Sequence, residues 1–385
     1  MNLLHTSDWH VGKRLMERER LQEQIAALDE IALLCERENV SVVLVAGDVF
    51  DTYLPSSEAE EVFFRAVKKI AGENRAVVLI SGNHDDGVRL SASAPLAEEQ
   101  GIYIIGNRRR PFRTGGDRPV RAVESGEGYL ILQNEAGERV YINALPYPNE
   151  ARFREEKTEE TYAEKTARWI AAGDSAYRKD MPHVLLSHLF VAGGRTSESE
   201  RDIDLGGARA VPLRSLPVCG YVALGHLHRM QKLGENVYYS GSPLAYSFDE
   251  AENDNCVLLL KTKGDEISEV RPISLTSGKK LVRLQANGVQ SALELLPRYE
   301  NCLIELTLFL KSPLTTAETQ SLRECNEGLV SLIARVESAQ GEGEAVRRSA
   351  LSTEQLFTQF YLSLYGSEPE ARLKTEFLSL LEENA

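Results

Sequence analysis

Residues that could bind metal ions occur in five short turns, each directly after an apolar segment. Five of the seven histidines lie in these turns, together with two aspartates and one asparagine. Imidazole, carboxylate and amide donors without a thiolate suit Mn²⁺, Fe²⁺, Zn²⁺ or Mg²⁺. Eight candidates exceed what one ion needs, so we expect two ions about 3.5–4 Å apart. The eight residues are Asp8, His10, Asp48, Asn83, His84, His188, His226 and His228.

Two ions so close together repel each other, so the ligand between them must be anionic. Asp48 is the natural choice, because it follows the middle one of three N-terminal strands. Asp8-Trp9-His10 and His226-Leu227-His228 each place two candidates on one side of an extended segment, since alternate residues share a face. Each motif alone is weak, whereas the ordered set at successive strand ends is specific. We interpret His5 and His183, which lie at strand starts or within strands, as structural.

The N-terminal elements that must position these turns are predicted by hydrophobic patterns. Segments 2–6, 40–45 and 76–80 are typical of buried strands, and helices are expected at 17–38 and 57–71. This alternation predicts an α/β fold with a parallel sheet and right-handed crossovers. The carboxyl ends of its strands meet at one edge, which is where open α/β sheets build their sites.

The next 200 residues are expected to alternate helices, strands and hairpins. Residues 106–128, rich in Gly, Arg and Pro, are interpreted as a loop. The predicted elements are helices at 88–100 and 158–172, and strands at 102–105, 129–132, 140–145, 184–186, 221–224, 237–239, 256–261 and 267–274.

A domain boundary is predicted at Ser277-Gly278. Residues 1–276 hold every candidate ligand, and 277–337 form a compact β-α-β-α-β unit without histidine. Residues 338–351 have the polar composition of a linker, and 352–385 contain two short amphipathic helices. Such helices cannot form a stable core alone, so they fold back on their own domain or bind a groove on a partner. We favour the partner.

Composition and charge limit the possible functions. The net charge of −14 opposes nucleic-acid binding through bulk electrostatics. Bound divalent ions would invert the charge at a carboxylate-rich site. Arg108-Arg109-Arg110 with Arg113 is a basic cluster that either contacts a phosphate backbone or forms a solvated loop.

Hydropathy predicts a cytoplasmic location by default, and the cysteine spacing limits the possible chemistry. The five cysteines are widely spaced, with no CxxC pair, which argues against a disulfide framework or a zinc site. No apolar run approaches the ~18 residues of a membrane span. Asp8 interrupts the N-terminal apolar residues, so no signal region is predicted.

The ordered motifs are similar to those of the calcineurin-like metallophosphoesterases, and particularly of DNA nuclease subunits in that family. The similarity extends over essentially the whole chain. It implies layered sheets flanked by helices, with 277–337 as a smaller capping domain that recognises DNA. The motifs that carry it are LHTSDWHVGK, LVAGDVFD, LISGNHD, LLSHLFVAGG, VALGHLHRMQ and SGSPLAYSFDE.

The resemblance also implies a role for each site residue. His84 would be the catalytic histidine that is not a metal ligand. From its place beside His84, rather than from the resemblance, Asp85 is interpreted as a residue that orients it. Metal one would be bound by Asp8, His10 and His228, metal two by Asn83, His188 and His226, and Asp48 would bridge them.

By the same resemblance, the protein would hydrolyse DNA phosphodiesters, most readily with Mn²⁺, as a double-strand exonuclease and a single-strand or hairpin endonuclease. It would act in DNA repair, recombination and replication. The C-terminal helices at 352–382 would bind a coiled-coil ATPase. Helices near 57–71 and 88–100 would form a homodimer. The alternatives are another two-metal phosphatase or phosphodiesterase, or a non-catalytic scaffold with structural metals.

Overall fold

The computed structural model describes most of the first 336 residues. The described residues are 1–106, 111–149, 159–197, 200, 209–336, 357, 358, 361, 369, 373 and 374. The predicted Arg108–Arg110 cluster, the 338–351 linker and most of the predicted C-terminal helices lie outside them.

A six-stranded sheet carries the N-terminal half of the site. Its order is β13-β12-β1-β2-β3-β4, with β1 to β4 parallel and β12 antiparallel to β1, which confirms the parallel N-terminal sheet. The strands are β1 (Asn2–Thr6), β2 (Val40–Ala46), β3 (Ala76–Ile80), β4 (Ile102–Ile105), β12 (Cys256–Lys263) and β13 (Glu266–Ser274).

A seven-stranded sheet supplies the other half. Its order is β10-β11-β9-β8-β7-β6-β5, and β7, β8, β9 and β11 run parallel. The strands are β5 (Arg121–Gly126), β6 (Tyr129–Gln133), β7 (Arg139–Leu145), β8 (His183–His188), β9 (Tyr221–Gly225), β10 (Gln231–Lys232) and β11 (Val237–Tyr239).

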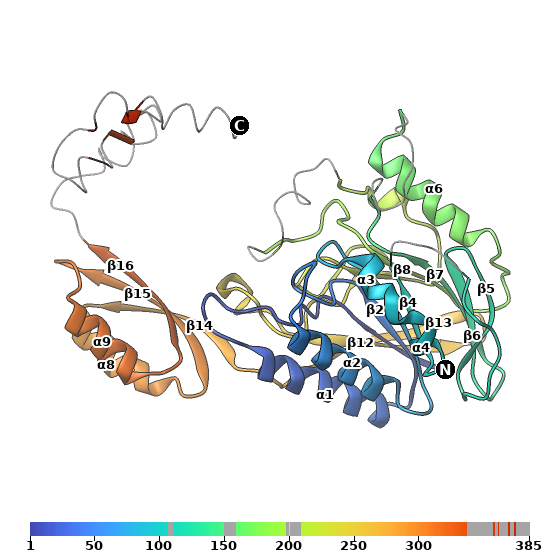
Figure 1. Ribbon diagram of the computed structural model, residues 1–385, viewed down its shortest axis with the longest axis horizontal. Coiled ribbons are helices and arrows are strands. Elements are labelled where there is room, and N and C mark those ends of the chain that lie inside the picture. The colour runs from blue at the N-terminus through green and yellow to red at the C-terminus, as the bar shows by residue number, and fades with distance from the viewer. Residues whose placement is uncertain are drawn as a thin grey trace.

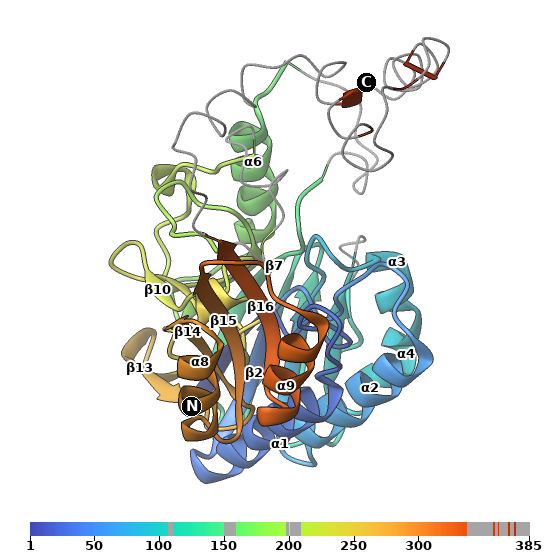
Figure 2. The ribbon, with the colours of Figure 1, turned by 90° about the vertical axis from the view of Figure 1, so that its left-hand side faces the viewer.

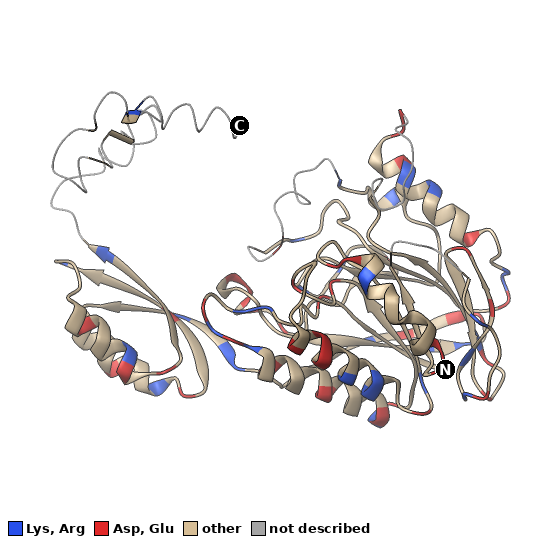
Figure 3. Cartoon of the chain, in the orientation of Figure 1, with Lys and Arg blue, Asp and Glu red and all other residues tan. Residues whose placement is uncertain are grey.

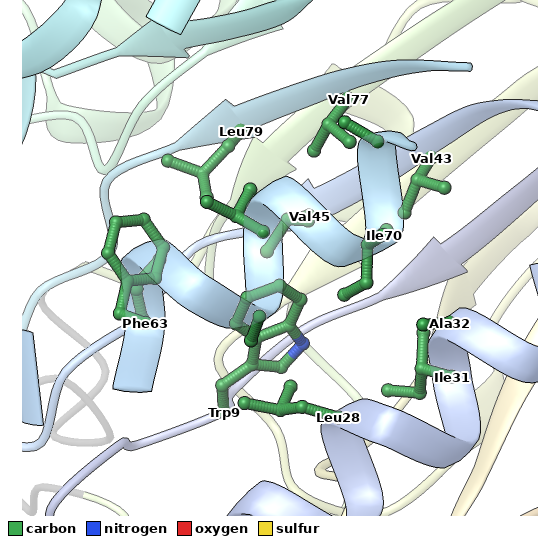
Figure 4. Close-up of a cluster of buried hydrophobic side chains, with 14 of the residues drawn as sticks. Trp9, Leu28, Ile31, Ala32, Val43, Val45, Phe63, Ile70, Val77 and Leu79 are labelled. Carbon is green, nitrogen blue, oxygen red and sulfur yellow. The ribbon is translucent and has the colours of Figure 1, made fainter. Parts of the chain in front are cut away.

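The two sheets stack face to face between helices. Leu44 and Val78 of the first sheet share one buried cluster with Ile142 and Leu186 of the second. The outer face of the first sheet is covered by α1 (Leu21–Arg37) and α2 (Ser57–Ala71), as Figure 1 shows. Trp9, Leu28, Phe63 and Ile70 pack there (Figure 4). Helix α6 (Tyr162–Asp174) packs on the second sheet through Trp169 and Ile170. The layers are therefore α/β/β/α, in which each sheet face buries apolar side chains.

The unit that follows residue 277 has the predicted β-α-β-α-β order. Its parallel strands β14 (Lys280–Asn287), β15 (Cys302–Leu310) and β16 (Leu329–Val336) form a third sheet, with α8 (Val289–Leu295) and α9 (Thr316–Cys325) on one face. Figure 2 shows this sheet and its helices in front of the larger domain. They share their own buried cluster, and Leu281 and Leu303 pack against Leu15 and Phe248 of the larger domain.

Several sequence predictions are wrong in detail. The helix expected at 17–38 begins at Leu21, because Leu15 and Arg18 form a tight turn before it. The helix expected at 88–100 is broken into α3 (Gly87–Leu90), a 3-10 turn and α4 (Ala94–Glu98). Pro95 lacks the N–H that a continuous helix needs at that position.

The loop expected at 106–128 contains strand β5. This edge strand pairs with β6 and has a register shift between Ala122 and Glu124. The segment lacks the apolar pattern of a buried strand, and pairing with β6 is what orders it. The helix at 57–71 and the hairpin of β6 and β7 are confirmed. In the described part of the chain, every helix is too short or too polar to cross a membrane.

Candidate metal centre

The structure brings all eight predicted site residues together where strand ends of the two stacked sheets meet. Asp8 and His10 follow β1, Asp48 follows β2, and Asn83 and His84 follow β3. From the second sheet, His188 ends β8, and His226 and His228 follow β9. Each residue is at most 6% exposed, so the centre is a buried polar cluster. Among the described residues, all of these except Asn83 contribute donor atoms to three overlapping groups with metal-binding spacing. Two of the groups are described below, and the third is His10, Asp48 and His84.

The first donor group is Asp8, His10 and His228. The Nε2 atoms of His10 and His228 lie 3.0 Å apart. Each Nδ1 faces a carboxylate: His228 donates to Glu250 Oε1 at 2.9 Å, and His10 Nδ1 lies 3.5 Å from Asp51 Oδ1. In the metal-free protein one proton can link the two Nε2 atoms, since one ring can donate the N–H that the other accepts. Two imidazole nitrogens and the Asp8 carboxylate that converge in this way fit a divalent ion, which would take the place of that proton.

The second donor group is Asp48, His188 and His226, with the amide of Asn83 among them. Asn83 Oδ1 lies 2.8 Å from His188 Nε2 and 3.0 Å from His226 Nδ1. His188 Nδ1 donates to the main-chain oxygen of Ala46 at 2.8 Å, which leaves Nε2 toward Asn83 and Asp48. The group offers oxygen and imidazole donors to one point, as a borderline divalent ion requires.

Asp48 belongs to both halves of the centre. Its Oδ2 lies 3.4 Å from His188 Nε2 and 3.7 Å from His10 Nε2. Its Oδ1 accepts the main-chain N–H of His84 at 2.8 Å, which fixes the carboxylate. Burial opposes its charge, but His188, His84 and His10 hold its pKa well below the usual value. An ionised, immobile carboxylate between two donor groups is suited to bridge two cations.

The electrostatics of the centre favour bound positive charge. Burial lowers the pKa of His228, yet Glu250 and Asp8 raise it to about 9. His188 likewise reaches a pKa of about 9, because Asp48 outweighs burial. Burial raises the pKa of Asp8 to about 7 despite the opposing effect of His188 and His228. A divalent ion would replace the protons that these groups hold.

The backbone of the turns is strained where the donors converge. Asp8, His10, Asp48 and His226 have φ values of 52°, 44°, 47° and 106°. Such conformations cost non-glycine residues about 1–3 kcal/mol each and cluster at functional sites. At Gly82, a Cβ atom would lie 2.0 Å from Asp48 Oδ1. That position must therefore be glycine for Asp48 to keep its place.

The prediction that Asp85 orients His84 is replaced by a different arrangement. The Asp85 carboxylate accepts main-chain N–H groups of Gly82, Phe50 and Val49 at 2.8, 2.9 and 3.2 Å, which joins the turns after β2 and β3. His84 Nδ1 instead donates to the main-chain oxygen of Asp51 at 2.7 Å.

The sequence interpretation missed Asp51 and Glu250. Asp51 faces His10, and its Oδ1 also accepts from Lys13 Nζ at 2.8 Å. Glu250 accepts from the ring of His228. Both lie within the quoted motifs, LVAGDVFD and SGSPLAYSFDE, but neither follows a strand directly. The sequence signal that could have identified them is that each is an acidic residue inside one of these motifs.

Comparisons with known proteins identify the family of this chain. Residues 1–230 match the calcineurin-like phosphoesterase family. The SbcD component of the SbcCD nuclease from Bacillus subtilis (strain 168) is 35% identical, over 99% of this chain and 97% of that protein. The chain belongs to the SbcD family. Another SbcD relative, from the SbcCD nuclease of Rhodobacter capsulatus, is 34% identical over 82% of each protein. The family predicted from the motifs is thus confirmed.

A solved structure from outside the SbcD family gives a weaker match. A dimetal phosphatase from Danio rerio aligns with 72% of this chain and 99% of its own at 14% identity and a TM-score of 0.38. That likeness is too low to support a conclusion.

Proposed function

We propose that this protein is a metal-dependent DNA nuclease that hydrolyses phosphodiester bonds at a two-metal centre. The observation that carries the proposal is the position of Asp48 between two buried donor groups, each of which combines residues from both sheets. Membership of the SbcD family supports DNA as the substrate, since its relatives are named as components of a nuclease.

We assign the ligands by donor group. Metal one would be held by Asp8, His10 and His228, and metal two by Asn83, His188 and His226. Asp48, which lies between the two groups, would contact both ions. The geometry of the two groups supports this division, and their oxygen and imidazole donors suit Mn²⁺.

When bound, two divalent ions lower the pKa of a water and offset the negative charge that develops on the phosphoryl oxygens. The chain supplies the remaining proton transfer through His84. Its Nδ1 is held by Asp51, so Nε2 is the atom that can face substrate. A protonated Nε2 can donate to the leaving oxygen of the scissile phosphate. His84 also lies within metal-binding spacing of His10 and Asp48, and the resemblance to the family is what assigns it to the substrate rather than to a metal.

The capping unit, residues 277–337, is proposed to contact DNA, because it packs beside the loop that leads to the site. Leu281 and Leu303 contact Phe248, two residues from Glu250. Figure 3 shows acidic and basic residues interspersed over the helices, so DNA contact must rest on local groups and the metal ions. We expect the protein to act as a double-strand exonuclease and as a single-strand or hairpin endonuclease. These activities would serve DNA repair, recombination and replication.

The SbcC ATPase is the proposed partner, in the cytoplasm. Residues 352–385 would bind it, so truncation after Ser338 should abolish ATPase binding and retain nuclease activity. Persistent binding would refute this assignment. A homodimer is proposed through helices near 57–71 and 88–100. The exposed apolar side chains of Leu54, Phe64, Val88 and Leu96 support that contact.

The experiment that tests the proposed function compares two substrates with Mn²⁺-loaded protein. We expect degradation of linear duplex DNA at a rate far above hydrolysis of p-nitrophenyl phosphate. Asp48→Asn should abolish both activities, which excludes a contaminating nuclease. Efficient monoester hydrolysis with intact DNA would favour another two-metal phosphatase, and no hydrolysis of either by metal-loaded protein would favour a scaffold.

A further inference from the structure

Glu250 is a buried carboxylate that touches the metal centre without belonging to a donor group. It is 0% exposed and ends a 3-10 turn, Phe248–Glu250, between β11 and β12. A buried carboxylate is costly unless its oxygens are satisfied. The hydrogen bonds of Glu250 therefore indicate its role in the protein.

Both carboxylate oxygens accept hydrogen bonds. Oε1 accepts from His228 Nδ1 and from Ser197 Oγ, each at 2.9 Å. Oε2 accepts the main-chain N–H of Tyr246 at 2.7 Å. The carboxylate is thus fixed from one side by main chain and aimed at the imidazole on the other.

The bond to Nδ1 decides which face of His228 can bind a metal. A neutral imidazole has one N–H, and a carboxylate can only accept. When Nδ1–H donates to Glu250, Nε2 carries the lone pair, and that atom faces His10 Nε2 at 3.0 Å. We propose that Glu250 is a positioning residue that fixes the ring and tautomer of His228 for metal one, an inference that rests on the proposed function.

The surrounding contacts make this positioning rigid. Glu200 Oε1 accepts the main-chain N–H of His228 at 2.8 Å, so main chain and ring are both held. The ring of Tyr246 meets His228 edge-on at 5.7 Å. Phe248, in the same turn as Glu250, packs against Leu281 and Leu303 of the capping unit. Support of this kind holds a ligand in its binding geometry before the metal arrives.

The two halves of the centre are positioned by different chemistry. His188 of the second group donates its Nδ1–H to the main-chain oxygen of Ala46, which side-chain substitution leaves in place. Removal of the Glu250 carboxylate should therefore weaken metal one and spare metal two. A general loss of folding would affect both.

The experiment is Mn²⁺ titration of the full chain by calorimetry, with no substrate present. We expect two ions on the wild-type protein. In Glu250→Ala, one ion should bind about 10–100-fold more weakly and the other unchanged. Glu250→Gln should give a smaller loss, because its amide oxygen can still accept from His228 Nδ1, although its NH2 group cannot accept from Tyr246. The control is Glu30→Gln, a carboxylate that accepts from Thr276 and Ser277 away from the centre and should bind both ions normally.

A second readout reports on the ring itself. In Zn²⁺-loaded protein with ¹⁵N-labelled histidine, His228 should show a slowly exchanging Nδ1–H that is lost in Glu250→Ala. If folded Glu250→Ala and Glu250→Gln both bind two ions with wild-type affinity, the proposed role of Glu250 is overturned, while the proposed function is not. Fewer than two ions on the wild-type protein would overturn the proposed function and, with it, this role.

Discussion

The main-chain N–H of His226 donates to both carboxylate oxygens of Asp8, at 3.0 and 3.1 Å. Asp8 follows β1 of the first sheet, and His226 follows β9 of the second. Since the two residues are far apart in sequence, this contact forms only when the sheets stack. The same carboxylate belongs to the first donor group. Assembly of the metal centre therefore requires that the two sheets are stacked.

Replacement of Asp48, the proposed bridging carboxylate, should weaken metal binding more than replacement of a proposed ligand from one group. Asp48→Asn removes the anion that faces both His10 and His188 while an amide oxygen can still accept from His84, so both Mn²⁺ ions should bind at least about tenfold more weakly. Asp8→Asn should weaken one ion. Calorimetric titration measures both variants, and equal effects would contradict the shared position of Asp48.

His84→Ala should separate metal binding from turnover. The variant keeps every proposed ligand, so it should bind two Mn²⁺ ions, while DNA hydrolysis falls by about 10²–10⁴-fold because the proton donor is lost. Metal content is measured by mass spectrometry and turnover on linear duplex DNA. A variant that loses an ion would show that His84 belongs to the ligand set.

Gly82→Ala should displace Asp48. The added Cβ would lie 2.0 Å from Asp48 Oδ1, and relief of that clash should cost about 1–3 kcal/mol of stability and weaken Mn²⁺ binding. The control is Gly137→Ala in the β6–β7 turn, where φ is +81° and the new Cβ meets open space. It should lose about 1 kcal/mol from backbone strain alone and bind Mn²⁺ normally. Denaturant unfolding measures the stability of both variants, and calorimetry measures their Mn²⁺ affinity. Normal Mn²⁺ binding by Gly82→Ala would contradict the claim that a side chain at position 82 displaces Asp48.

Acid should destabilise the protein partly through His5. This side chain is fully buried beside the Tyr221 hydroxyl, and burial lowers its pKa from 6.5 to about 3. Between those values the unfolded chain binds a proton that the folded state excludes. The free energy of unfolding should therefore fall as pH falls below 6.5, by up to about 1.4 kcal/mol per pH unit.

His5→Gln, which cannot be protonated, isolates this contribution. Urea unfolding of both proteins from pH 7.5 to 5 should give a shallower pH dependence for the variant, by up to one proton. Identical slopes would show that His5 does not exclude the proton.

Sequence alone predicts much of the site because parallel strands share one edge. Buried strands ending at Thr6, Ala46 and Ile80 can deliver their polar turns to one place, and the structure has them there. The pairing of the second sheet with the first is not encoded in any local pattern. Contacts such as His226 with Asp8 therefore had to come from the structure.

The supporting carboxylates were not predictable from sequence, because their roles depend on tertiary contacts. Glu250 and Asp51 look like ordinary acidic residues in loops, and only the packed structure aims them at His228 and His10. Asp85 sits beside His84 in sequence, yet its oxygens accept main-chain N–H groups, including those of Val49 and Phe50. Strand β5 was missed for the same reason, since pairing with β6 orders it.

The most direct test of the two-metal centre is anomalous diffraction from crystals soaked in Mn²⁺. The structure predicts two peaks about 3.5–4 Å apart, one beside Asp8, His10 and His228 and the other beside Asn83, His188 and His226, with Asp48 contacting both. A single peak, or two peaks without Asp48 between them, would contradict the account.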